Sequence, residues 1–114
     1  LHGGHPGGFG AFPRFFRMAV RELHILSLEE AVRRMTSLAA ANVGISNRGR
    51  IAPGMFADLV LLDTAALADR ATPRDPHLTS TGVRAVWTNG VLVYNGAATG
   101  AFPGRVIRNA AAAR

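Results

Sequence analysis

Residues 48–63 read RGRIAPGMFADLVLLD, and the spacing of apolar residues changes within this stretch. The pair Pro53-Gly54 predicts a turn in its first half. Its second half is a short apolar run over residues 57–62, with Asp58 near its start and Asp63 directly after it, which is typical of a β-strand. The chain is therefore predicted to change from helical to extended structure near residues 47–50.

Downstream of this strand the sequence predicts a β-hairpin. Strands over residues 83–88 and 91–94 flank Asn89-Gly90, a pair that readily adopts the positive φ angles of a type I′ turn. The remaining expectations are a loop over residues 64–81 with one helical turn at 65–69, a second turn at Asn95-Gly96, and an edge strand at 105–108.

Upstream of residue 48 the periodicity is helical. Residues 1–10 are rich in glycine and predict a loop, and Pro13 suits the first position of a helix. That helix has an apolar face of Phe15, Phe16, Ala19, Val20 and Leu23.

A second helix is predicted from a capping box, in which Ser27 accepts the backbone N–H of Glu30. Its apolar stripe holds Leu28, Ala31, Val32 and Met35. A short helix over residues 38–43 is predicted to follow and to end at Gly44.

Length and composition limit the architecture. The chain has 114 residues, enough for one domain but well short of the roughly 250 residues of a closed (β/α)8 barrel. Its hydrophobic content of 48% and mean hydropathy of +0.16 are high for a small domain, so we expect apolar faces that meet a partner. The sequence begins Leu1-His2 without an initiator Met, and we expect it to start inside a longer protein.

Charge and residue usage exclude several functions. All 13 basic residues are arginine and they are scattered along the chain, which indicates a solvated surface and no nucleic-acid partner. No apolar run is long enough to span a membrane. Cysteine is absent, so disulfides and thiolate metal sites are excluded, and we expect a cytoplasmic protein.

Residues 48–63 resemble the amidohydrolase pattern RG.I..G..ADLV..D, at which the chain leaves the last barrel helix for a small β-rich domain. The hairpin at residues 82–90 is similar to the one that follows in that family. The segment Thr36-Ser37-Leu38-Ala39-Ala40 resembles the TS.PA helix junction, with Ala39 in place of proline.

Three further segments resemble the N-acyl-D-amino-acid deacylases, also called D-aminoacylases. Residues 5–14, HPGGFGAFPR, are similar to HPR.YG.FPR, with Gly7 in place of Arg and Phe9 in place of Tyr. Residues 69–77 resemble DRAT..DPH, and residues 100–108 resemble G..PGR..R. The three segments occur in the family's order, so the resemblance covers nearly the whole chain.

The resemblance implies an α+β piece of a larger enzyme. Residues 1–49 would be the end of a (β/α)8 barrel, with a rim loop and the terminal helices. Residues 50–114 would be the C-terminal strands of the small β-sandwich domain. The missing N-terminal barrel would be the chain's partner, and its apolar stripes would self-associate without it.

The implied reaction is zinc-dependent hydrolysis of N-acyl amino acids of the D configuration, giving a carboxylate and a free amino acid. The zinc ligands and the proton-handling Asp of the family would precede Leu1, so no catalytic residue is expected in this chain. His5 would approach the substrate. The alternatives are a cyclic amidase of the dihydropyrimidinase or dihydroorotase type, and a stand-alone, non-catalytic interaction module.

The chain's own histidines do not predict a metal site, because His2 and His5 lie in a glycine-rich loop and His24 and His77 are distant in sequence. We therefore expect the chain to bind no zinc. Asp58 and Asp63 bracket a strand and could suggest a general acid/base pair, but their spacing puts them on opposite faces of that strand. They are therefore interpreted as strand-end acceptors of backbone hydrogen bonds. Trp87 is interpreted as a packing residue. The Gly3-Gly4 and Gly7-Gly8 pairs lack the context of a phosphate-binding loop.

Overall fold

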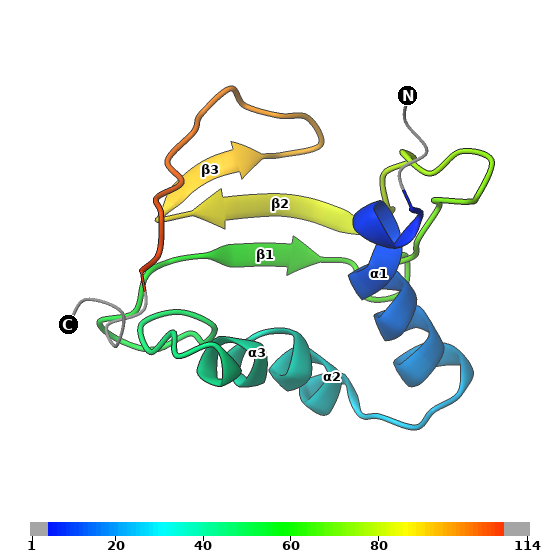
Figure 1. Cartoon of the computed structure of the whole chain (residues 1–114), viewed down its shortest axis with the longest axis horizontal. Helices are drawn as coiled ribbons and strands as arrows, with labels where there is room; N and C mark the ends of the chain where they lie inside the picture. The colour runs from blue at the N-terminus through cyan, green and yellow to red at the C-terminus, as the bar shows by residue number, and fades with distance from the viewer. Residues whose placement is uncertain (1–4, 109–114) are drawn as a thin grey trace. The chain divides into compact units, whose positions relative to one another are not determined.

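The chain runs through helices first and a β-sheet second (Figure 1). The computed structural model describes residues 5–108. In chain order its elements are α1 (Gly7–Phe16), the π-helix η1 (Arg17–Glu22), α2 (Leu28–Met35), α3 (Ser37–Asn42), β1 (Leu59–Leu62), β2 (Val83–Thr88) and β3 (Val91–Tyr94). The α+β class predicted from the sequence is confirmed.

The fold divides into two compact units, and each takes in two separate stretches of sequence. One unit combines Leu1–Ala31 with Leu62–Val83, and the other combines Val32–Leu61 with Arg84–Arg114. We call them the first and the second unit. His2 and the pair Gly3-Gly4 lie outside the described residues.

Helix α1 begins at Gly7, so the predicted loop over residues 1–10 and the predicted start at Pro13 are wrong where the chain is described. Pro6 already has helical angles, and the His5 imidazole accepts the N–H of Gly7 at 3.0 Å. Pro13 lies inside the helix. The run then continues as η1, and directly after it the Leu23 N–H donates to the Met18 carbonyl at 2.8 Å.

The core of the first unit is small. Its buried apolar side chains are Phe16, Ala19, Ala31 and Leu67. Phe16 was predicted to lie on a face left open for a partner, and this is wrong, since the chain itself leaves Phe16 only 1% exposed. Arg21 on η1 fixes the start of the long loop by donating to the Thr64 carbonyl at 3.0 Å and the Ala65 carbonyl at 2.5 Å.

The long loop of the first unit is more extended than the sequence predicted. The helical turn expected at residues 65–69 is shorter and starts earlier, as a turn at residues 64–66 in which the Ala66 N–H donates to the Asp63 carbonyl at 3.2 Å. It stops there because Ala68 pairs with Thr81 in an antiparallel bridge. Gly82 follows this bridge with a φ of +84°, and a Cβ there would lie 2.5 Å from the Leu67 backbone. The loop closes tightly because glycine stands at this position.

Both predicted helix signals of the middle region are confirmed. Ser27 Oγ accepts the Glu30 N–H at 3.2 Å at the start of α2. Helix α3 ends at Asn42 and is followed by Gly44 with a positive φ of 77°. The break between α2 and α3 persists without a proline, at Thr36, whose hydroxyl donates to the Val32 carbonyl at 2.7 Å.

The three strands form one sheet in the order β1-β2-β3 (Figure 1). Strands β2 and β3 pair antiparallel, with Thr88 opposite Val91 and a register shift between Val86 and Trp87. Asn89 and Gly90 have φ angles of 49° and 79°, which confirms the predicted turn.

The C-terminal segment departs from the prediction. The turn at Asn95-Gly96 is present, and Tyr94 pairs with Ala98 across it. Residues 105–108 form no strand in the described part of the chain, so the predicted edge strand is wrong. The loop just before residue 105 is attached to the hairpin turn, because the Asn89 side chain donates to the Pro103 carbonyl at 2.7 Å.

None of the helices within residues 5–108 is long and apolar enough to cross a membrane.

Candidate functional site

Two segments that were singled out in the sequence, residues 5–14 and 69–77, come together in the first unit. The Phe9 ring meets the His77 ring edge-to-face, with centroids 5.1 Å apart and an angle of 87°. A Cβ at Gly10 would lie 3.0 Å from the Asp69 Cβ, so the helix and the loop approach closely there. The sequence order of the segments did not predict this contact.

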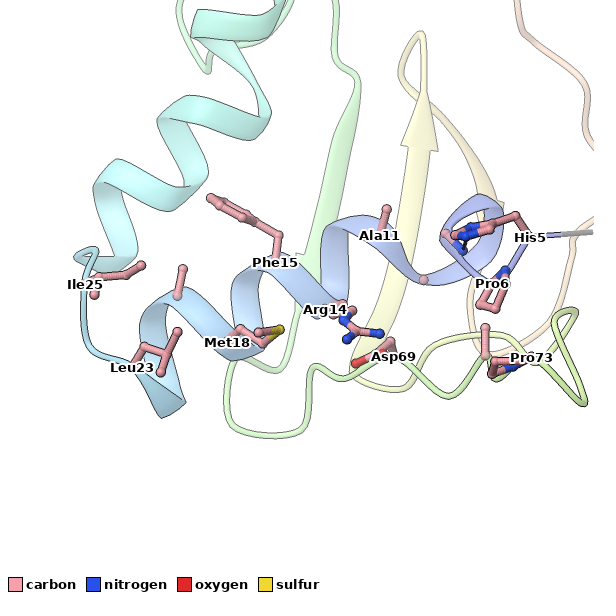
Figure 2. Close-up of a pocket in the computed structure, with 14 residues that line it drawn as sticks. His5, Pro6, Ala11, Arg14, Phe15, Met18, Leu23, Ile25, Asp69 and Pro73 are labelled. Atoms are coloured by element: carbon pink, nitrogen blue, oxygen red, sulfur yellow. Dashed lines mark hydrogen bonds between the residues drawn. The ribbon is translucent and has the colours of Figure 1, made fainter.

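The same two segments border a cavity of about 860 Å³ (Figure 2). Its polar lining residues are His5, Arg14 and Asp69. Figure 2 shows Arg14 and Asp69 between an apolar end and the end that holds His5. The apolar end comprises Phe15, Met18, Leu23 and Ile25. Such a cavity can accept a molecule with an apolar part and a small number of polar groups.

His5 lies at this cavity as part of the helix start. Its Nδ1 accepts the Gly7 N–H, so the proton of the neutral imidazole is on Nε2. A Cβ at position 7 would lie 2.9 Å from that Nδ1. The glycine that replaces the arginine of the deacylase pattern therefore permits this orientation of the His5 ring.

The Asp69 carboxylate is held in an ion pair with Arg17. Arg17 Nε donates to Asp69 Oδ1 at 3.0 Å, and Arg17 Nη2 lies 2.9 Å from the same oxygen. Arg17 also pairs with Glu22. The hydrogen bonds to Glu22 and then to Asp69 raise the pKa of the Arg17 guanidinium above its usual value. Sequence reasoning missed this pair because its members are 52 residues apart.

A second polar cluster lies in the second unit, around the turn of the hairpin. Asp58 Oδ1 accepts the Asn89 N–H at 2.8 Å, and Arg48 pairs with the other carboxylate oxygen. Arg48 also donates to Asn89 Oδ1 at 2.6 Å and stacks over the Phe56 ring, 4.2 Å from its centroid.

The cluster lowers the pKa of the Asp58 carboxyl. Burial by itself would raise the pKa of the Asp58 carboxyl, but the Asn89 N–H and the Arg48 guanidinium together hold it below its ordinary value. Asp63 accepts the Ala66 N–H at 3.2 Å. Both aspartates thus accept backbone hydrogen bonds, as the structural interpretation of the sequence predicted. Trp87 is half-buried on β2.

The described residues do not fit a metal ion. Within residues 5–108 no three side chains among His, Asp and Glu are grouped so that they could bind one. His5 is used at the start of α1 and His77 contacts Phe9. We therefore assign no metal-dependent step to these residues.

Comparison with known proteins gives consistent matches. Residues 5–94 match the model of the Amidohydrolase family. The chain is 47% identical over 104 residues to N-acyl-D-aspartate deacylase of Alcaligenes xylosoxydans xylosoxydans, and this match covers 90% of the chain and 21% of that protein.

Two solved structures are also similar. One is the N-acyl-D-glutamate deacylase of Bordetella bronchiseptica complexed with zinc and a phosphonate inhibitor, with a TM-score of 0.84, 41% identity, and coverage of 91% of this chain and 22% of that one. The other is a D-aminoacylase mutant in complex with copper chloride, with a TM-score of 0.86, 41% identity, and coverage of 90% and 22%. The chain spans roughly a fifth of the length of the relatives it matches.

Proposed function

Because this chain belongs to the amidohydrolase family, we propose that it forms the C-terminal part of an enzyme that hydrolyses N-acyl D-amino acids. The products would be a carboxylate and a free amino acid. The identity of 47% to an N-acyl-D-aspartate deacylase carries this proposal. Since the chain spans roughly a fifth of that protein, the activity is proposed for a complete enzyme, and the 114 residues alone are proposed to be inactive.

The proposed division of the chain is residues 1–49 as the end of a (β/α)8 barrel and residues 50–114 as strands of the small β-domain. It is supported by the order of elements, because the helices all precede residue 50 and the strands all follow it in the described chain. The proposed partner is the N-terminal barrel. A cytoplasmic location is proposed with it, on the absence of cysteine.

Zinc is proposed as the cofactor of the complete enzyme, because a similar structure was solved with zinc. Bound zinc polarises a carbonyl and activates a water molecule. The described residues do not fit the metal, so its ligands are proposed to lie in the remainder of the enzyme.

His5 is proposed to lie next to the substrate. Its Nδ1 is occupied by Gly7, which leaves the Nε2–H as a donor at the cavity. In a complete enzyme, His5→Ala should raise KM for an N-acyl D-amino acid. His24→Ala is the matched control, because His24 is another exposed histidine but does not line the cavity. Equal KM values for the two variants would contradict this role.

The decisive experiment joins the chain to its upstream coding sequence and measures amino acid release with ninhydrin. The substrates are matched D and L forms of N-acetyl-aspartate, N-acetyl-glutamate and N-acetyl-methionine, with a cyclic ureide for the cyclic amidase alternative. A preference for D forms supports the deacylase assignment. A preference for L forms or for the ureide would refute it, and an unrelated upstream domain would favour the interaction module.

A further inference from the structure

The chain contains two Asn-Gly pairs, Asn89-Gly90 and Asn95-Gly96, in very different surroundings. In such a pair the backbone nitrogen of glycine can attack the side-chain amide of asparagine, because glycine has no side chain to obstruct it. The attack requires a free glycine nitrogen and a side-chain amide that can rotate towards it. The two pairs share the same chemistry, so a difference between them must come from the fold.

In the first pair, Asn89-Gly90, both the side-chain amide and the glycine nitrogen make hydrogen bonds. The Asn89 amide accepts from Arg48 at 2.6 Å and donates to the Pro103 carbonyl at 2.7 Å. The Gly90 nitrogen donates to the Ala57 carbonyl at 2.9 Å. Reaction at Asn89 therefore requires these hydrogen bonds to open first.

The second pair, Asn95-Gly96, is exposed to solvent. Asn95 and Gly96 are both exposed, in the turn that follows β3. The Asn95 backbone N–H donates to the Ala97 carbonyl at 3.0 Å, but within residues 5–108 neither the Asn95 side chain nor the Gly96 N–H makes a hydrogen bond. The space where a Cβ of Gly96 would lie has no atom within 4 Å.

We propose that Asn95 is a site of spontaneous deamidation and that the fold protects Asn89. The Gly96 nitrogen loses its proton and bonds to the Asn95 Cγ, the Cγ–Nδ2 bond breaks, and ammonia leaves with that proton. Water then opens the resulting succinimide at either carbonyl and gives aspartate or isoaspartate. No oxidant, metal or enzyme is needed.

The modification changes the end of the hairpin. It adds a negative charge to a chain whose net charge is +6. Isoaspartate also inserts an extra methylene into the main chain between Tyr94 and Ala98, which pair across this turn. The Tyr94–Ala98 bridge should therefore be lost in the isoaspartate form, while the Asn89 turn is retained.

The test incubates the full 114-residue chain in mildly alkaline buffer and follows both sites by mass spectrometry. Trypsin leaves both asparagines on one peptide, so fragment ions must assign each mass increase of about 1 Da, the result of replacing an amide by an acid. Asn95 should react at least about tenfold faster than Asn89, because reaction at Asn89 must wait for local opening. The two rates should converge in urea.

Two variants sharpen the test. Asn95→Gln should remove the fast phase and leave the slow one, and Arg48→Ala should accelerate reaction at Asn89 without changing Asn95. Equal rates at the two sites in the native chain would overturn the proposal. A rate ratio that stays the same in urea would also overturn it, because the difference would then come from neighbouring sequence and not from the fold.

Discussion

Ser80 donates a hydrogen bond to the carbonyl oxygen of Phe9, with a distance of 3.2 Å between the two oxygens. Phe9 is four residues before Pro13, which lies inside α1 and has no N–H to give to that carbonyl. The hydroxyl of the long loop thus replaces a donor that the helix lacks. This bond also attaches the loop of residues 64–81 to the helix of the first unit.

Ser80→Ala should destabilise the chain by about 1 kcal/mol, because it leaves the Phe9 carbonyl without this partner. In a Pro13→Ala background the helix supplies its own N–H, so the same change should cost close to nothing. Urea denaturation of the four proteins gives the coupling free energy. Ser46→Ala, at an exposed serine, is the control. Additive effects would show that Ser80 does not compensate for Pro13.

Asp58 should make stability depend on pH. Its pKa is lowered in the folded chain, so the unfolded chain binds a proton more readily and the stabilisation is present at neutral pH. The difference in unfolding free energy between the wild type and Asp58→Asn should shrink as the pH falls below about 4, the ordinary pKa of aspartate. A difference that is constant from pH 7 to low pH would contradict the role of Arg48 and Asn89 at Asp58.

Gly90→Val should cost about 1–3 kcal/mol, because a β-branched residue is strained at a φ of 79°. A Cβ at Gly90 would meet no atom within 4 Å, so the loss would come from the backbone and not from a clash. Gly104→Val is the matched control, since that position is equally open and lacks a positive φ. Thermal denaturation that gives equal losses for both variants would refute the turn assignment.

The features predicted well from the sequence are those fixed by neighbouring residues. The turn at Asn89-Gly90 depends on these two adjacent residues. The cap of α2 depends on Ser27 and Glu30, which are three residues apart. The start of α1 was missed because Pro13 is typical of a first helical position, and its compensation by Ser80 is distant in sequence. The contact of Phe9 with His77 depends likewise on how the long loop folds back, which no local pattern specifies.

The first unit should associate in solution. Phe15, Leu23 and Ile25 line its cavity and are 37%, 58% and 69% exposed. Apolar surface of this extent favours contact with another molecule. Light scattering should therefore show dimers or larger species, and Ile25→Ser should reduce them more than Phe102→Ser, a change in the second unit. A monomer over a wide concentration range would contradict this expectation.

We propose that these residues are part of a zinc-dependent deacylase whose metal ligands lie outside them. The most direct measurement is the rate of N-acetyl-D-aspartate hydrolysis by the chain alone and by the chain joined to its upstream sequence, each with zinc and with a chelator, alongside elemental analysis for zinc. We predict zinc-dependent activity and bound zinc in the joined protein, and neither in the chain alone. Turnover by the 114 residues alone, or one tightly held zinc per chain, would contradict this proposal.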